Sequence, residues 1–257
     1  MKKGIIRMDV LPRPEVKEYN GYMLMKFTSK EEYRQDFLNG ELFFNTSDYF
    51  SMCDDVGRGD ADEGKTFIVN PENSNYISAN LEKYGDKYYI VTRDNSDNPE
   101  EYKVGILSYS SSENRNRKVM SLYTVYLDFK GKKISDFSSK IKEEFGNFGI
   151  LILDRREFFQ RIIEALRENK SAKDAYMGFV EYLPEDKQQG LVNWNPFRKR
   201  DCFSYQNEFR ITFITEDDRP LRLNLGCSLR DIAVPIDTDD LHEIYFEGED
   251  LLYPLYP

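Results

Sequence analysis

An apolar run that leads directly into an amphipathic helix is the feature that most constrains the fold. Residues 148–153 are almost continuously apolar, which predicts a strand. Asp154 and Glu157 follow with the spacing of a capping box, which predicts that a helix begins there. The helix carries an apolar stripe of Phe158, Phe159, Ile162, Ile163 and Leu166 opposite Arg161, Glu164, Arg167 and Glu168. The chain is therefore expected to pack helices against a sheet.

The N-terminal part of the chain also combines predicted strands with a predicted helix. Residues 22–27 form a run that is typical of a buried strand. Ser29 and Glu32 have the spacing of a capping box, and Gly40 stands where a short helix would end. Residues 41–44 then resume an extended pattern. We expect a strand, a helix and a second strand here.

The middle and the tail of the chain are rich in short β-like runs separated by turn residues. A further amphipathic helix is expected near residues 137–145. The expected strands cover residues 66–69, 87–92, 103–107, 121–127 and 177–183, and a β-rich tail begins at Tyr205. The prediction is an α+β (mixed α/β) fold with a central, largely antiparallel sheet and several flanking helices.

Composition and length set the organisation that we expect. The 257 residues include 14% aromatic side chains, which supply enough apolar surface for a sizeable core. We find no linker or internal repeat and predict one compact domain over residues 1–257. The apolar tail of residues 251–257 either docks on the core or offers a strip to a protein partner or a second subunit, as in a homo-oligomer.

Charge and residue usage disfavour several classes of protein. The formal net charge of −10 disfavours nucleic-acid binding. A single histidine, His242, leaves no Ser-His-Asp constellation, and no glycine-rich phosphate loop is found. No run of about 18 apolar residues and no signal-peptide core is present, so we expect a cytoplasmic protein without a membrane span.

An acidic, glycine-rich loop occupies residues 54–64. Asp60, Asp62 and Glu63 are weak candidate ligands for Mg²⁺ or Ca²⁺, although their spacing does not match an EF-hand. Arg58 either pairs with these carboxylates or points inward and binds an anion. We favour a solvated loop over a metal site and predict no metal.

The segment 205–214 is the strongest candidate for a functional strand, because its residues alternate between polar and apolar. Its polar row either faces solvent or lines a site. The row consists of Gln206, Glu208, Arg210 and Thr212. Arg198-Lys199-Arg200, just upstream, is a positive cluster that either meets an anion or is only solvated. Trp194 either stacks on a base or nicotinamide ring or packs in the core under a loop, and we favour the core.

Gln206-Asn207-Glu208 resembles the Gln-x-Glu element of ADP-ribosyltransferases. The resemblance implies that NAD is the substrate. It also implies that Glu208 bonds the nicotinamide ribose and stabilises the transition state, while Gln206 orients the acceptor. The opening strand, helix and strand are similar to the start of that superfamily, with Lys26 nearest to the residue that grips NAD. Tyr205, Arg210, Arg58 and Trp194 complete the expected binding residues.

A broader resemblance is to bacterial and phage proteins that share a Gly-Asp-x-x-Glu-Gly loop and a late Gln-x-Glu-Phe-Arg strand. These motifs are Gly59 to Gly64 and Gln206 to Arg210 here. The resemblance implies no particular activity. Two functions stay open: an NAD- or nucleotide-dependent transferase or glycohydrolase of a bacterial or phage toxin or defence system, and a non-catalytic, phage-related protein that captures a protein or nucleotide partner.

Overall fold

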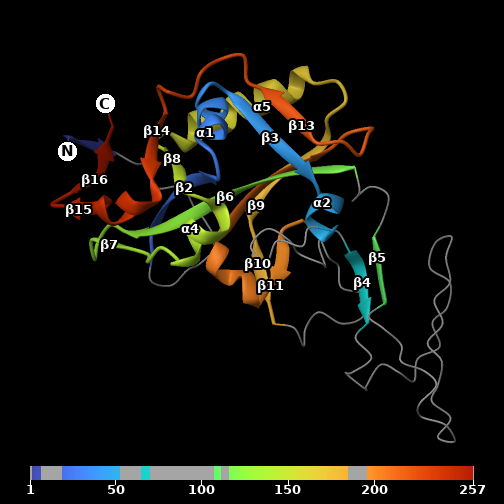
Figure 1. The fold of residues 1–257 in the computed structure, drawn as a ribbon, viewed down its shortest axis with the longest axis horizontal. Coiled ribbons are helices and arrows are strands. Elements are labelled where there is room, and N and C mark those ends of the chain that lie inside the picture. Colours follow the sequence, from blue (N-terminus) through green and yellow to red (C-terminus); the bar gives the residue numbers. More distant parts are fainter. Residues whose placement is uncertain are drawn as a thin grey trace, which may run out of the picture.

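A nine-stranded sheet forms the centre of the molecule (Figure 1). The computed structural model describes residues 2–6, 19–52, 65–69, 107–110, 116–184 and 196–256. Within these ranges, all strand pairings in the large sheet are antiparallel. The α+β fold with a central, largely antiparallel sheet is thus confirmed. In spatial order, six of the strands are β13 (Leu221–Asn224), β3 (Glu41–Thr46), β6 (Arg117–Asp128), β2 (Gly21–Thr28), β8 (Phe148–Ile152) and β14 (Ala233–Asp237). Strands β12 (Glu208–Ile214) and β7 (Lys133–Ile134) pair with β6, and β9 (Lys173–Phe179) pairs with β12.

The long strand β6 makes the sheet fork. Strands β12 and β7 pair with one edge of β6, so β2 and β3 share the other edge. The β2 pairing stops at Met25 opposite Tyr123, and the β3 pairing is confined to Asn45 opposite Val119 and its neighbour. Residues 120–122 therefore lie opposite neither strand, and a gap opens at this point of the sheet.

Two helices cover one face of the sheet. Helices α1 (Glu31–Leu38) and α5 (Arg155–Glu168) lie near each other in Figure 1 and bury side chains in one apolar cluster with β2, β6 and β8. Phe158 and Ile162 of the predicted stripe are fully buried, whereas Ile163 is exposed. The predicted helix after residue 153 is thus confirmed, with a narrower stripe than expected.

The other face is covered by C-terminal elements and by helix α4 (Lys140–Phe145). These C-terminal elements are the 3-10 helix η4 (Thr238–Glu243) and strand β16 (Asp250–Leu255), which pairs with β1 (Lys2–Ile6) and β15 (Tyr245–Glu247). Leu251, Leu252 and Tyr253 are buried, so of the two alternatives for the tail the structure shows docking on the core.

The remaining elements are short. They are α2 (Ser47–Met52), the pair β4 (Lys65–Val69) and β5 (Leu107–Ser110), the parallel pair β10 (Glu181–Leu183) and β11 (Arg198–Arg200), and the 3-10 helix η3 (Asp201–Gln206). The strand predicted at 177–183 is in fact split into β9 and β10. The strand predicted at 87–92 and most of that at 103–107 lie outside the described residues. No helix among the described residues is long and apolar enough to cross a membrane.

The two predicted capping boxes have different outcomes. The Asp154 side chain accepts a hydrogen bond from the backbone N–H of Glu157 at 3.0 Å, which confirms the helix start. The prediction for Ser29 is wrong, because the N-cap of α1 is Lys30 and no side chain caps it. Gly40 does follow the end of α1, with a φ of 89° that favours glycine.

Replacement of Gly40 by alanine is expected to destabilise the protein more than replacement of Gly226. Both residues have positive φ, which costs an L-residue about 1–2 kcal/mol. A Cβ at Gly40 would also lie 2.1 Å from the carbonyl oxygen of Cys227, whereas one at Gly226 would meet none of the described atoms within 4 Å. Urea unfolding of Gly40→Ala and Gly226→Ala measures the difference, and equal losses would contradict it.

Candidate functional site

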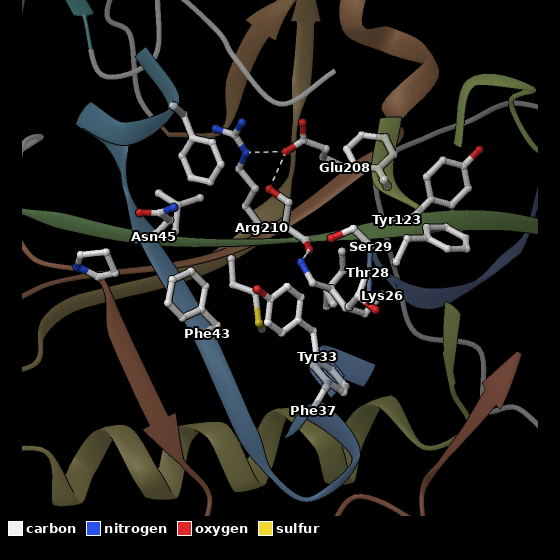
Figure 2. A pocket seen from close by; sticks show the side chains of 18 of the residues that line it. Lys26, Thr28, Ser29, Tyr33, Phe37, Phe43, Asn45, Tyr123, Glu208 and Arg210 are labelled. Atoms are coloured by element: carbon white, nitrogen blue, oxygen red, sulfur yellow. Dashed lines mark hydrogen bonds and ion pairs between the residues drawn. The ribbon is translucent and has the colours of Figure 1, made fainter. Parts of the chain in front are cut away.

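A cavity of about 540 Å³ lies where the sheet forks (Figure 2). The ends of β2 and β3, the middle of β6 and the start of β12 all contribute to its walls. Aromatic rings form part of its walls, and its charged lining residues are Lys26, Asp36, Glu41, Lys199, Glu208, Arg210 and Arg222. The fork thus creates a space with both rings and charges around it.

Lys26 spans the gap in the sheet. Ser121 lies between the β2 and β3 pairings, so neither strand bonds its carbonyl oxygen in a ladder. The Lys26 ammonium group donates a hydrogen bond to this oxygen at 2.9 Å. Lys26 was predicted to bind substrate, and the structure places it in the cavity wall.

Glu208 is the centre of a buried ionic cluster at the closed end of the cavity. One carboxylate oxygen accepts from the Lys199 ammonium at 2.6 Å, and the other accepts from the Nε of Arg210 at 2.7 Å. The Ser121 hydroxyl donates to the second oxygen at 2.7 Å. All three charged side chains are almost completely buried, with exposed fractions of 4%, 8% and 3% for Lys199, Glu208 and Arg210.

The two cations keep Glu208 ionised. Burial by itself raises the pKa of a carboxyl group, because it penalises the charged form. The charges of Arg210 and Lys199 and their hydrogen bonds outweigh burial and hold the pKa of Glu208 well below its usual range. The closed end of the cavity therefore holds a fixed carboxylate between two fixed cations.

The backbone before Glu208 differs from the predicted strand. The strand was expected to begin at Tyr205, but Tyr205 and Gln206 end the 3-10 helix η3, and β12 begins at Glu208. Asn207 between them is left-handed, with a φ of 42°. Gln206 nevertheless reaches the cavity, where its side-chain oxygen accepts from Lys199 at 2.7 Å.

Of the two alternatives for the polar row, exposure to solvent is wrong. Glu208, Arg210 and Thr212 are buried, because β11 and η3 cover this part of the sheet. Tyr182 of β10 adds to the cover, since its hydroxyl oxygen accepts from the Glu208 backbone N–H at 2.8 Å. Burial, with the nearby Glu208 charge, raises the pKa of Tyr182, so its hydroxyl remains neutral.

Tyr205 lies in a different environment from the one predicted. Its hydroxyl donates to the carboxylate of Glu144 on α4, and the Lys140 ammonium lies 4.3 Å from the centre of its ring. Tyr205 is not among the residues that line the cavity. It connects η3 to α4, and its role in substrate binding stays a prediction.

The other predicted binding residues and ligands fall in parts of the chain that the structure does not describe. Arg58 and Trp194 lie there, as do the weak metal-ligand candidates Asp60, Asp62 and Glu63. Among the described residues, no group of His, Cys, Asp and Glu is arranged to hold a metal ion. The prediction for the acidic loop stays a prediction.

The outer part of the cavity has an aromatic rim that the sequence did not reveal. Tyr33, Phe43 and Tyr49 line the cavity with exposed fractions of 41%, 49% and 42%. Arg222 lies over the Phe43 ring at 5.9 Å and donates to Asp36 at 2.9 Å. Exposed rings at the edge of a cavity are suited to stacking on a planar ligand.

Comparison with known proteins gives no relative: no family model, no curated protein and no solved structure matches this chain. Its function must therefore be argued from the cavity.

Glu208→Gln is expected to destabilise the fold by about 3 kcal/mol, because it leaves two buried cations without their carboxylate. Chemical unfolding followed by circular dichroism measures the loss at pH 7. The matched control is Glu168→Gln on the exposed side of α5, which should change stability little.

The stability difference between wild type and Glu208→Gln is expected to depend on pH. The folded-state pKa of Glu208 is lowered, so its contribution is complete above the unfolded-state pKa of about 4.3 and declines as the pH falls below it. The stability difference between wild type and Glu208→Gln should shrink from pH 5 to about pH 3. A difference that stays constant would show that the ion pairs do not stabilise the fold.

Proposed function

We propose that the cavity captures a nucleotide and that the protein acts as a binding protein. The observation that carries this proposal is the arrangement of one cavity with an aromatic rim and a cationic closed end. A nucleotide combines a planar ring with a charged phosphate, and the cavity offers a suitable environment for each. Its volume of about 540 Å³ is also in the range of small-molecule sites.

The closed end supports an anion through the cationic side chains that line it. Lys26, Lys199 and Arg210 bring three positive charges, and Glu208 brings one negative charge. Charge-assisted hydrogen bonds from lysine and arginine are among the strongest contacts for a phosphate. The phosphate would therefore enter first and the ring would stay at the rim.

The second candidate is the NAD-dependent transferase or glycohydrolase. One observation favours it: Gln206 and Glu208 both line the cavity, and Glu208 is ionised. An ionised carboxylate is what stabilises the positive charge of a breaking glycosidic bond. Here, however, Lys199 and Arg210 already engage both oxygens of Glu208, and their charges oppose a developing cation. Capture therefore fits the geometry better than catalysis.

Calorimetric titration with the four ribonucleoside 5′-monophosphates and NAD tests nucleotide capture. We expect at least one to bind, and Phe43→Ala to raise its Kd about tenfold, because stacking of a base on an aromatic ring contributes about 1–3 kcal/mol. Tyr176→Ala is the control, since this exposed ring on β9 does not line the cavity. Failure of all five ligands to bind would overturn the proposal.

Nicotinamide release from NAD tests the second candidate. If the protein is a binding protein, wild type releases none, with or without cell lysate as a source of acceptors. Release by wild type that is abolished in Glu208→Gln but kept in Glu168→Gln would establish the enzyme instead. Circular dichroism of both variants shows whether a lost activity reflects a lost fold.

A further inference from the structure

The side chains of β3 alternate between the core and the cavity. Leu42 and Phe44 are buried in the core cluster that α1 and α5 cover, whereas Phe43 and Asn45 line the cavity (Figure 2). Successive side chains of a strand point to opposite faces, so Phe43 and Asn45 lie on one face, about 7 Å apart along the strand. A base that stacks on the Phe43 ring would therefore present its edge to Asn45.

The amide of Asn45 has a fixed orientation. Its side-chain oxygen accepts a hydrogen bond from the backbone N–H of Thr46 at 3.0 Å. An N–H group can bond only the oxygen of an amide, so this contact determines which end of the Asn45 side chain is the nitrogen. Asn45 is half-buried, and none of the residues that the structure describes accepts from this nitrogen. Asn45 thus offers its N–H donors to the contents of the cavity.

We propose that Asn45 recognises the base of the captured nucleotide and selects a base with a keto oxygen, such as uracil, guanine or hypoxanthine. The inference rests on the proposed capture of a nucleotide and names the class of base. A keto oxygen accepts a hydrogen bond from the Asn45 amide. Cytosine and adenine carry an amino group at the same position, which is itself a donor and would face another donor.

The contact with Thr46 also works against the usual pairing of asparagine with adenine. In that pairing the amide nitrogen donates to N7 of the base, and the amide oxygen accepts from the adenine amino group. Here the oxygen of Asn45 already accepts from the backbone of its own strand. The side chain therefore presents donors to the base without the acceptor that adenine requires.

Two matched pairs of ribonucleoside 5′-monophosphates test this selection. Uridine and cytidine monophosphates form one pair, and inosine and adenosine monophosphates form the other. Within each pair, a keto oxygen and a ring N–H replace an amino group and a bare ring nitrogen. We expect the keto member to bind about fivefold more tightly, because it gains a hydrogen bond where the amino member leaves a donor unpaired. Calorimetric titration gives the four Kd values.

The variant Asn45→Asp reverses the hydrogen-bonding character of the side chain. One carboxylate oxygen can still accept from the Thr46 N–H, and the other now accepts where the amide nitrogen donated. We expect the preference to invert, so that the amino member of each pair binds more tightly. The measured quantity is the ratio of the two Kd values within a pair, so a general loss of affinity caused by the added negative charge cancels.

Two further variants complete the set. Asn45→Ala removes donor and acceptor together and should bring the ratio within each pair to about one. Asn169→Asp at the end of α5 is the matched control, because the Asn169 oxygen also accepts from a backbone N–H, that of Ser171, and Asn169 is not among the residues that line the cavity. It should keep the wild-type ratios. Circular dichroism shows which variants are folded, and Asn45→Ala decides if Asn45→Asp is not.

The outcomes distinguish this selection from nucleotide capture itself. A keto preference that the Asn45 variants invert or abolish, and that Asn169→Asp keeps, supports the inference. Equal binding within the pairs, or a preference for the amino members, overturns it and leaves nucleotide capture intact. A keto preference that survives in the Asn45 variants also overturns it, because another donor at the rim, such as Arg222, must then recognise the base. Binding of none of the monophosphates overturns the inference, and if NAD fails as well it overturns nucleotide capture too.

Discussion

The ionic cluster of Glu208, Lys199 and Arg210 is the interaction on which the candidate site depends. Charges are costly to bury unless they are paired and hydrogen-bonded, and here both carboxylate oxygens are occupied. The cluster also ties β11 and η3 to the central sheet, because Lys199 bonds Gln206 as well. Without the carboxylate, two cations would face each other in a buried space. The same cluster places Lys199 and Arg210 in the cavity wall, where the proposed anion would bind.

The fork in the sheet provides the space. A continuous sheet would pair every residue of β6 on both edges and leave no opening. Because β2 and β3 meet β6 at different places, the carbonyl of Ser121 needs another donor, and Lys26 supplies it. Helix α1 connects the two diverging strands, so the rim residues Tyr33 and Phe43 come from the same unit that creates the gap. The geometry of the opening and the chemistry of its rim thus have a common origin.

Several residues of the site could be predicted, and their local arrangement could not. Alternation of polar and apolar residues identified Glu208 and Arg210, and both line the cavity. It wrongly placed Tyr205 and Gln206 in the strand, because these residues end a 3-10 helix and the left-handed Asn207 breaks the period of two. Tyr205 consequently bonds Glu144. The sequence did not indicate that Phe43 lines a site, since an apolar run does not distinguish an exposed ring from a buried one.

The sequence by itself determined the elements: the α+β class, helix α5 with its Asp154 cap, and the strands around it. These follow from interactions between residues that are close along the chain, and such interactions are visible as periodicity. Only the tertiary structure decided the site. Ser121 is 87 residues from Glu208 and 95 from Lys26, and Asp36 is 186 from Arg222. Contacts over such separations depend on which strands lie side by side and where they part, and no local pattern encodes that choice.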